Sequence, residues 1–376
     1  MSVSHRPYWV DYAFADAAMA VIRIGARRLR AITIPRLDAR ECHAGSGVSL
    51  IMLYRVFRAF ALTVSFALMP QTILAADKLG ICYDKAQAHL VALAKLRDFY
   101  AAEGLDVDLT PFPSGRQALE AMFVGKCALA TVAEIPIVHY SLQRNDFLIL
   151  ASISNSDDYE RIIVRSDRGI LTAADLRGRS IAVPRFTTAH YFLDMYLLAN
   201  GLKPQDVKQI YLPPQEVAAA FRRGDVDAAA QWEPFIHMLA TEFASKVKTF
   251  STPGLHVSPF LLVTGREFVR KNPVAIERVL RALVRAERYT KEQPANAKAL
   301  ITRFFESNES EMNFLWPLKE HRVSLDQSLL FILENAARWE IGLLPAAQRP
   351  ALPNYLDFIY VEGLKAAKPA AVTVIH

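Results

Sequence analysis

The chain repeats one pattern 99 residues apart, as Gln117-Ala-Leu-Glu-Ala-Met-Phe-Val-Gly125-Lys-Cys-Ala-Leu-Ala-Thr-Val-Ala-Glu134 and as Glu216-Val-Ala-Ala-Ala-Phe-Arg-Arg-Gly224-Asp-Val-Asp-Ala-Ala-Ala-Gln-Trp-Glu233. Each copy has apolar residues at helical spacing, a glycine, a short apolar run and a glutamate. A helix that ends at glycine, which tolerates the left-handed C-cap, followed by a buried strand is the αβ step of a mainly parallel sheet. Two copies predict two lobes, with Glu134 and Glu233 at the strand ends where ligands bind.

Alternating apolar segments around the repeat predict an α/β protein with two βαβ lobes and additional C-terminal helices. Strands are expected at 78–83, 105–111, 128–133, 147–153, 180–184, 209–212 and 257–264, and helices at 90–103, 116–124, 171–178, 189–200, 273–293, 295–305, 325–341 and 355–365. Residues 162–165 are expected to leave the first lobe and 257–264 to return to it. The predicted domains are therefore lobe 1 at 77–165 and 257–365, lobe 2 at 166–256, and a tail at 366–376.

The segment 52–76 has the composition of a secretory signal peptide. Arg55 and Arg58 precede an uncharged apolar run, and Ala75-Ala76 offers small residues for cleavage. The run is too short to span a bilayer comfortably, so we expect export to the periplasm, with an uncleaved anchor or a core helix as the alternative. Residues 1–51 would then be a mis-assigned start or a disordered leader.

The basic charge of the chain is concentrated in this N-terminal part. Residues 1–76 hold nine Arg and four acidic residues, which is +5 of the formal net charge of +6, so the following 300 residues carry only +1. A nearly neutral remainder lacks the electrostatic signature of a nucleic-acid-binding protein. Its length suffices for two packed lobes.

The cysteine and histidine patterns give no sign of a metal site. Cys82 and Cys127 follow the N-terminal part at predicted strand positions, and an oxidising compartment would permit a disulfide, but we expect two buried thiols. The sequence has no CxxC, no HExxH and no histidine cluster with metal-ligand spacing. We therefore predict no metal and no cofactor.

Several short segments together resemble one protein family. They are 95–107 (Lys-Leu-Arg-Asp-Phe-Tyr-Ala-Ala-Glu-Gly-Leu-Asp-Val), Ser114-Gly115, 175–183 (Asp-Leu-Arg-Gly-Arg-Ser-Ile-Ala-Val), 200–207 (Asn-Gly-Leu-Lys-Pro-Gln-Asp-Val), 224–228 (Gly-Asp-Val-Asp-Ala) and 232–234 (Trp-Glu-Pro). In this order and spacing they resemble the substrate-binding proteins of ABC importers for nitrate, taurine and aliphatic sulfonates, a family that also contains thiamine-pyrimidine precursor binders. The likeness runs from about residue 79 to 263 and continues more loosely to 365.

The resemblance implies a bilobed type II periplasmic binding protein that closes around a small solute. It also implies docking on a membrane permease that works with an ATPase, and we expect a monomer without catalytic activity. Because closure removes the solute from water, each buried polar group must find a partner, which rejects mispaired solutes. Residues 162–165 and 257–264 are the candidate hinges.

Two predicted helix entries are the first candidate ligand contacts. Thr187 and Thr188 precede a helix, so their hydroxyls and the free N–H groups of its first turn would hold an oxygen-rich anion, with plain N-capping by one threonine as the alternative. Ser114 and Arg116 form the matching entry in the first lobe, where a solvated cap is the alternative. The family often has Gly-Ser or Gly-Thr where this chain has Phe186-Thr187.

Trp232 resembles the family residue that walls the cleft. An indole face suits alkyl or heteroaromatic groups, and core packing is the alternative. Glu134 and Glu233 are expected to accept ligand N–H groups or to connect the lobes on closure. His190 and Tyr191 lie one turn into a helix and are candidates to face the cleft, with a surface or capping role as the alternative for His190.

Tyr83, Asp84 and Asn155 complete the predicted site through their positions at or beyond strand ends. The family often shows a Gly-Tyr or Trp-containing stretch where this chain has Tyr83-Asp84. The hydroxyls and Arg116 favour a sulfonate or carboxylate ligand, whereas the acidic candidates favour a ligand with N–H donors. A zwitterion or an aminopyrimidine would satisfy both.

Two other functional classes share this fold. A thiamine-pyrimidine synthase type of enzyme would need a reactive Lys or His and an iron-binding set of His and Cys, and its cysteine-rich segment is absent. A signal peptide also disfavours that intracellular chemistry. A ligand-sensing module without transport is the second alternative, which sequence alone does not separate from an importer component.

Overall fold

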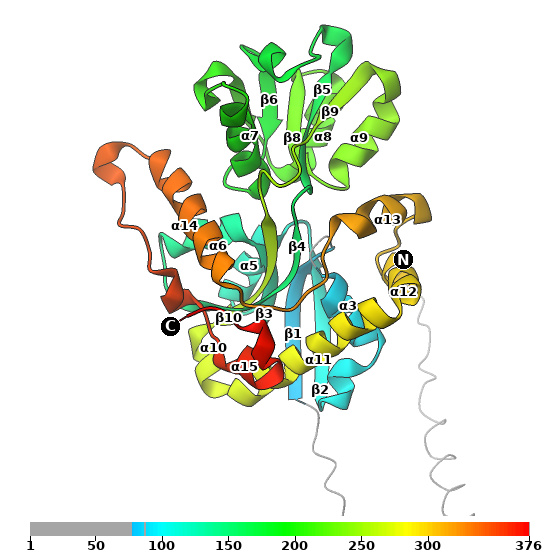
Figure 1. The fold of residues 1–376 in the computed structure, drawn as a ribbon, viewed down its shortest axis with the longest axis vertical. Coiled ribbons are helices and arrows are strands. Elements are labelled where there is room, and N and C mark those ends of the chain that lie inside the picture. Colours follow the sequence, from blue (N-terminus) through cyan, green and yellow to red (C-terminus); the bar gives the residue numbers. More distant parts are fainter. Residues whose placement is uncertain (1–76, 86–87, 376) are drawn as a thin grey trace, which may run out of the picture. The chain divides into compact units, whose positions relative to one another are not determined.

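The chain forms two five-stranded sheets whose strands are arranged in equivalent order. The computed structural model describes residues 77–85 and 88–375. The predicted leader at 1–51 and signal peptide at 52–76 lie outside these residues. The first sheet has the order β2-β1-β3-β10-β4 and the second β7-β6-β8-β5-β9 (Figure 1). The strands are β1 (Asp77–Asp84), β2 (Leu105–Phe112), β3 (Leu129–Ala133), β4 (Phe147–Ser156), β5 (Glu160–Arg165), β6 (Ser180–Val183), β7 (Lys208–Tyr211), β8 (Ala228–Trp232), β9 (Val247–Phe250) and β10 (Ser258–Gly265).

Helices connect these strands and continue beyond them. The connecting helices are α3 (His89–Leu96), α4 (Phe99–Ala102), α5 (Gly115–Phe123), α6 (Glu134–Ser141), η4 (Ala173–Leu176), α7 (Thr188–Ala199), α8 (Pro214–Arg223) and α9 (Phe235–Phe243). The later ones are α10 (Arg266–Lys271), α11 (Pro273–Glu292), α12 (Pro294–Phe304), α13 (Glu309–Leu315), α14 (Gln327–Gly342), η9 (Tyr355–Phe358) and α15 (Glu362–Ala367). Over the part of the chain that the structure describes, no helix is long and apolar enough to cross a membrane.

One strand in each sheet runs against the other four. In the first sheet this strand is β10, which pairs antiparallel with β3 and β4, and in the second it is β5, which pairs antiparallel with β8 and β9. Each of them enters from the other lobe, because β5 follows β4 of the first sheet and β10 follows β9 of the second. The prediction of two similar, mainly parallel lobes therefore agrees with the structure.

Helices cover both faces of the second sheet. Alternate residues of a strand point to opposite faces, so Ile162 packs with the core that includes α7 and Ile163 with the core of α8 and α9. Phe192 and Leu193 represent α7 in the first of these cores, and Phe221 represents α8 in the second. Figure 1 shows α7 on one side of this sheet and α9 on the other.

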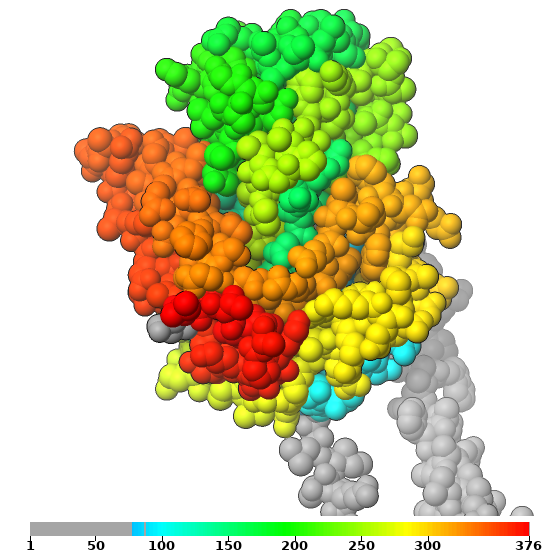
Figure 2. Space-filling model, viewed as in Figure 1, coloured from blue at the N-terminus to red at the C-terminus, as the bar shows by residue number. Residues whose placement is uncertain are grey.

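The C-terminal helices add a layer to the first lobe. The long helix α11 packs on α3, α4 and α15, and the atoms of α15 (red) and α11 (yellow) meet in Figure 2. Gly363 makes this approach close, because a Cβ added there would lie 3.0 Å from Leu280 and 3.3 Å from Ile276. The apolar side chains of these helices, among them Leu280, Leu283 and Leu364, thus form core.

Several predicted boundaries are wrong. The helix expected at 90–103 is broken between α3 and α4, because Asp98 has φ of 53°, in the left-handed region that interrupts helical hydrogen bonding. The helix expected at 355–365 is divided into η9 and α15, because Ile359 between them bridges to Ile149 of β4. Helices α6, α9, α10 and α13 and strand β9 were not predicted.

The hinge prediction also needs correction. Residues 162–165 belong to strand β5 of the second sheet, and most of 257–264 belongs to β10 of the first, so both are held in strand ladders. The chain passes between the sheets at 157–159 and 251–257 instead. The domain limits stay a prediction, and sheet membership favours placing the first boundary before β5.

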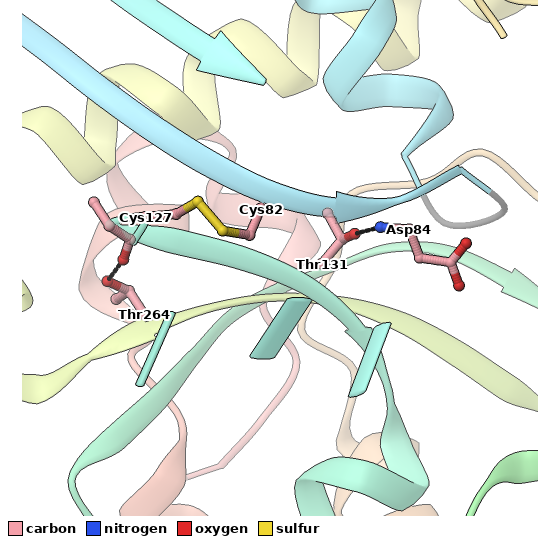
Figure 3. The surroundings of a disulfide bond; sticks show 6 residues. Cys82, Asp84, Cys127, Thr131 and Thr264 are labelled. Carbon is pink, nitrogen blue, oxygen red and sulfur yellow. Dashed lines mark hydrogen bonds between the residues drawn. A yellow bond between two sulfur atoms is a disulfide. The ribbon is translucent and has the colours of Figure 1, made fainter. Parts of the chain in front are cut away.

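The prediction of two buried thiols is wrong, because Cys82 and Cys127 form a disulfide (Figure 3). Strand β1 pairs with β3 through Ile81 and Leu129, and Cys127 lies just before that pairing, which sets a Cα–Cα distance of 5.7 Å. Two hydrogen bonds flank the bridge, from the Asp84 N–H to Thr131 and from Thr264 to the Ala128 carbonyl. The bridge ties two neighbouring strands of the first sheet.

We expect reduction of this disulfide to lower the free energy of unfolding by about 4 kcal/mol, because the bond restricts a loop with a sequence separation of 45 in the unfolded chain. Urea unfolding with and without reductant measures the change. Cys42→Ser is the control, because it removes the third cysteine of the chain. If Cys82 and Cys127 are bonded, this variant, unfolded without reductant, should contain no reactive thiol. Two reactive thiols in that form would contradict the disulfide.

The two glycines that end the repeated helices give a matched comparison. Gly125 and Gly224 both have φ of +78°, but a Cβ at Gly224 would lie 2.6 Å from the Arg168 guanidinium, whereas the same Cβ at Gly125 meets nothing within 4 Å. Arg168 binds the Gly224 and Val226 carbonyls and Asp227. Gly125→Ala should cost about 1 kcal/mol of stability from backbone strain, and Gly224→Ala about 1 kcal/mol more from lost hydrogen bonds. Equal urea midpoints for the two variants would refute this difference.

Candidate functional site

A cavity lies where the carboxyl ends of both sheets' strands meet, and we call it the central cavity. Its volume is about 390 Å³, open mouth included. It is lined by Asp84, Ser114, Gly115, Arg116, Ala133, Pro136, Tyr159, Glu160, Thr187, Thr188, Trp232 and Phe260. The structure thus brings together six of the predicted site residues, Asp84, Ser114, Arg116, Thr187, Thr188 and Trp232.

Two helix N-termini meet at this cavity, α5 from the first lobe and α7 from the second. At α5, Ser114 caps the helix through a hydrogen bond from the Gln117 N–H to its Oγ at 3.3 Å. At α7, Thr187 occupies the N-cap position, but its Oγ1 donates to the Pro184 carbonyl at 2.7 Å and does not cap the helix. The Thr187 side chain therefore leaves the first N–H groups of α7 uncapped beside the cavity, where their dipoles favour a negative charge.

Arg116 adds a positive charge to the wall, although part of that charge is already paired. Its Nε binds Glu120 at 3.0 Å, and its guanidinium lies 5.8 Å from the centre of the Tyr140 ring. Tyr140 in turn donates a hydrogen bond to Glu120. Arg116 is half-buried, so the wall carries a positive group with some capacity left for an anion.

A larger cavity, which we call the apolar cavity, adjoins the central one. It measures about 900 Å³ with its mouth and shares Asp84, Tyr159 and Trp232 with the central cavity. Its other lining residues are Lys85, His89, Pro111, Phe112, Pro113, Pro234, Phe235, Phe305, Ser307, Glu311, Met312, Leu315 and Lys319. The two cavities are neighbours, because the shared residues lie in both walls, and we refer to them together as the cleft.

Lys319 is a buried cation of this cleft. Its Nζ lies 4.7 Å from the centre of the Tyr159 ring and 4.9 Å from that of Phe260. Burial lowers the pKa of Lys319 to about 7, against the opposing charges of Asp84 and Glu160. The amine is therefore partly neutral near neutral pH, and a nearby anion would favour its charged form.

Glu134 lies outside the cavity wall, since its carboxylate is fully buried and held by the protein. His256 Nε2 lies 2.9 Å from Glu134 Oε1, and Ser258 donates to Oε2 at 3.0 Å. The other ring nitrogen of His256 is 3.6 Å from Glu160. This cluster joins the end of β3, the crossing before β10 and the start of β5, so Glu134 connects the lobes and does not line the cavity.

Glu233, the counterpart of Glu134 in the repeat, also lies outside the wall. It accepts a hydrogen bond from the His237 N–H at 2.8 Å, which satisfies the first turn of α9, and it pairs with Arg161 at 3.3 Å. Burial raises the pKa of Glu233 to about 7, despite these two partners. Its carboxylate is therefore occupied as a helix cap.

His190 and Tyr191 point into a polar and aromatic cluster on the second lobe and are not in the wall. His190 accepts from the Phe186 N–H at 3.3 Å, and its other nitrogen is 3.0 Å from Gln209. Burial lowers the pKa of His190, against the charge of Asp194. Tyr191 packs edge-on against His256 at 5.1 Å. Both rings serve packing and capping.

Tyr83 and Asn155 are likewise outside the wall. Tyr83 precedes the cavity residue Asp84 on β1 and packs 6.1 Å from Phe305, a residue of the apolar cavity's wall, but it lines neither cavity itself. Asn155 exchanges backbone hydrogen bonds with Glu320, so its backbone joins β4 to the C-terminal segment.

The cleft also contains residues that were not predicted: Tyr159, Glu160, Phe260, Lys319 and the residues of α13. Tyr159 ends the first crossing and Glu160 begins β5, and an acidic stretch directly after a buried strand was a usable signal for them. Lys319 and α13 come from the C-terminal part, far from the repeat in sequence, and no local pattern marks them.

No metal centre is formed among residues 77–85 and 88–375, where no group of three or more His, Cys, Asp or Glu side chains could hold an ion. The expectation that the protein needs neither metal nor cofactor stays a prediction.

Comparison with known proteins gives the family of this chain. A family model described as NMT1/THI5 like matches residues 86–297, which is more than half of the sequence. The chain belongs to the NMT1/THI5-like family. The resemblance to substrate-binding proteins of ABC importers is confirmed, since relatives of this chain are named as an aliphatic sulfonates-binding protein, a taurine-binding periplasmic protein and an ABC transporter periplasmic binding protein.

Two relatives of this NMT1/THI5-like protein come from Escherichia coli strain K12. One is named for binding aliphatic sulfonates and is 30% identical over 192 residues, which covers 51% of this chain and 60% of the relative. The other, a taurine-binding periplasmic protein, is 27% identical over 212 residues, 54% of this chain and 63% of the relative. The matched part thus spans less than two thirds of these relatives' length.

A solved structure confirms the fold class. The alkanesulfonate-binding protein SsuA from Xanthomonas axonopodis pv. citri, solved with MOPS bound, aligns with a TM-score of 0.66 at 23% identity, over 75% of this chain and 98% of SsuA. The NMT1/THI5-like chain therefore has the predicted α/β, bilobed type II periplasmic binding protein fold.

The His256 cluster predicts a pH dependence of stability. Burial opposes protonation of His256, but the charge and hydrogen bond of Glu134, with Glu160, outweigh it and raise the pKa of His256 to about 10. A raised folded-state pKa contributes stability that is complete below the unfolded value of 6.5 and is lost as pH rises through 10. The stability advantage of the protein over His256→Gln should therefore shrink by several kcal/mol between pH 7 and pH 10.

Urea unfolding of both proteins across this range makes the measurement. Lys319 acts in the opposite direction, because its lowered pKa adds stability as pH rises from about 7 towards 10.5, so the difference between the two proteins is the informative quantity. His237→Gln, which changes a half-buried histidine outside the cluster, is the matched control. A constant difference between the protein and His256→Gln would contradict the assignment.

Proposed function

We propose that this protein is the extracytoplasmic solute-binding component of an ABC importer. It captures a small organic anion in the central cavity and delivers it to a membrane permease, which works with an ATPase. It performs no chemistry on the solute. The names of the relatives support this, since they are binding proteins for aliphatic sulfonates and taurine, and a further one is an ABC transporter periplasmic binding protein.

The observation that carries the proposal is the meeting of two helix N-termini at one cavity. Ser114-Gly115 at α5 and Thr187-Thr188 at α7 lie in the same wall. An anion between them would accept hydrogen bonds from backbone N–H groups and a threonine hydroxyl, next to the guanidinium of Arg116. With both glutamates of the repeat occupied elsewhere, the acidic contribution to the wall comes from Asp84 and Glu160.

We therefore expect the solutes to share an anionic group. A sulfonate or carboxylate suits the two helix N-termini better than a cation does. Asp84 and Glu160 would accept hydrogen bonds from an N–H group elsewhere on the solute. The proposed class of solutes therefore includes zwitterions such as taurine-like compounds. An aminopyrimidine lacks the anion that the helix N-termini favour, so a thiamine-precursor function is the less supported alternative.

The proposal includes location and assembly. Export by the signal peptide at 52–76 would deliver a monomer to the periplasm, which is where the taurine-binding relative is named to act. The near-neutral remainder of the chain gives no reason to expect a nucleic-acid partner. A ligand-sensing module without transport would use the same cavity, and uptake by cells lacking the gene distinguishes the two.

Thr188→Val tests the anion site with a nearly isosteric change. The variant loses the hydroxyl but keeps the helix N-terminus, so we expect the Kd for methanesulfonate to rise about tenfold, as for one lost charge-assisted hydrogen bond. Isothermal titration calorimetry measures the Kd. Thr172→Val is the matched control, because Thr172 is an exposed cap residue of η4 outside the cavity.

Two results would count against the proposed site. Folded protein that binds neither methanesulfonate, sulfate, taurine nor acetate would remove the support for an anion-binding function. Equal Kd values for the protein and Thr188→Val would show that the anion binds elsewhere.

A further inference from the structure

The apolar cavity extends the cleft beyond what a small anion would occupy. Its volume of about 900 Å³, mouth included, compares with about 390 Å³ for the central cavity. Asp84, Tyr159 and Trp232 belong to both walls, so a group bound in the central cavity is adjacent to the apolar one. A solute that reached from one to the other would bury far more surface than an inorganic anion.

The wall of the apolar cavity is mainly aromatic and aliphatic. Its apolar members are Pro111, Phe112, Pro113, Tyr159, Trp232, Pro234, Phe235, Phe305, Met312 and Leu315. Phe112 and Phe235 are only half-buried, so part of each ring remains open to solvent. Apolar surface left in water costs roughly 25 cal/mol per Å², and a solute that covers it recovers this free energy on binding.

This wall is held in place by contacts of α13, which contributes Met312 and Leu315. Asn308 caps α13 through a hydrogen bond from the Glu311 N–H at 2.7 Å. On its other side, Phe314 stacks on His237 of α9 at 4.3 Å, and Arg161 lies over the same ring at 5.4 Å. The helix therefore touches the second lobe.

The charges of this wall favour a neutral occupant. The wall holds two acidic side chains, Asp84 and Glu311, and two lysines, Lys85 and Lys319; because Lys319 is partly neutral near neutral pH, these groups leave no net positive charge. His89, the remaining titratable member, is buried with its pKa lowered well below the usual value by burial and by Lys319, and it is therefore neutral. A second anionic group would meet no net positive charge in the apolar cavity. The central cavity differs, because its helix N-termini favour an anion.

We infer that the solute is an organic anion with an aromatic or similarly bulky neutral tail. The anionic group lies between the N-termini of α5 and α7, and the tail lies in the apolar cavity among Trp232, Phe235 and α13. This inference rests on the proposed function and specifies its substrate class. Aryl sulfonates and aryl carboxylates are therefore preferred over methanesulfonate, taurine and nitrate.

Calorimetric titration with a matched pair of anions tests this inference. 2-Naphthalenesulfonate and methanesulfonate share the head group and differ in the tail, and we expect the aryl compound to bind at least tenfold more tightly. Thr188→Val should weaken both compounds by the same factor, because it changes only the head-group site.

Two variants address the tail separately. Phe235→Ala removes one ring of the wall and should raise the Kd for 2-naphthalenesulfonate about tenfold while leaving that for methanesulfonate unchanged. Ser307→Trp fills the same cavity without removing a core side chain, and it should have the same selective effect. Phe331→Ala is the matched control, since Phe331 on α14 is 61% exposed and lines neither cavity.

The possible outcomes distinguish the tail site from the anion site. Tighter binding of the aryl compound, lost selectively in Phe235→Ala and Ser307→Trp, supports the tail site. Binding of methanesulfonate as tight as that of 2-naphthalenesulfonate overturns the inference but leaves the proposed function intact. Absence of binding by either anion, in folded protein, overturns both.

Discussion

The buried carboxylate of Glu134 is the constraint on which the cleft depends. An ionised group with no exposure is costly unless paired and hydrogen-bonded, and Glu134 obtains both from His256 and Ser258. His256 belongs to one crossing between the sheets, and its second ring nitrogen faces Glu160, just after the other crossing. A single ionic cluster therefore fixes both crossings against the end of β3. Because Glu160 also lines the central cavity, the same cluster determines where one side of its wall lies.

The repeat places Glu134 and Glu233 at equivalent strand ends, yet the two lobes use them differently. Glu134 opens α6 and pairs across the lobes, whereas Glu233 caps α9 and pairs with Arg161. In both cases the glutamate lies at the start of the following helix, where the helix dipole favours negative charge, but only Glu233 binds a backbone N–H there. The shared sequence pattern thus reflects a shared helix start. Ligand contact was inferred from the strand-end position, but each carboxylate already has partners within the protein.

The fold was predictable because its signals are local and repeated. Helices α5 and α8 end at Gly125 and Gly224 in the left-handed conformation, and the strands after them are fully buried, so periodicity and glycine identified both. The site was predictable where it is built from helix starts, as at Ser114 and Thr188, and from strand ends, as at Asp84 and Trp232. Tyr159 and Lys319 reach the cleft from a crossing and from the C-terminal part, and contacts between distant segments leave no periodic trace. The disulfide was missed for the same reason, since it depends on the register of β1 against β3.

Phe186 explains how the entry to α7 is kept without the small residue that the family often has there. Its φ of 55° lies in the left-handed region, where glycine is favoured and a large residue requires compensation. The compensation is visible in three contacts: the ring stacks on His139 at 4.7 Å, Arg185 lies over it at 4.6 Å, and its N–H donates to His190. Since His139 belongs to α6 of the first lobe, the Phe186 side chain also connects the two lobes beside the central cavity. His190, buried with a lowered pKa, can accept that N–H because it is neutral. The role of His190 is thus to accept the Phe186 N–H and so to support the backbone conformation that places Thr187 and Thr188 in the wall.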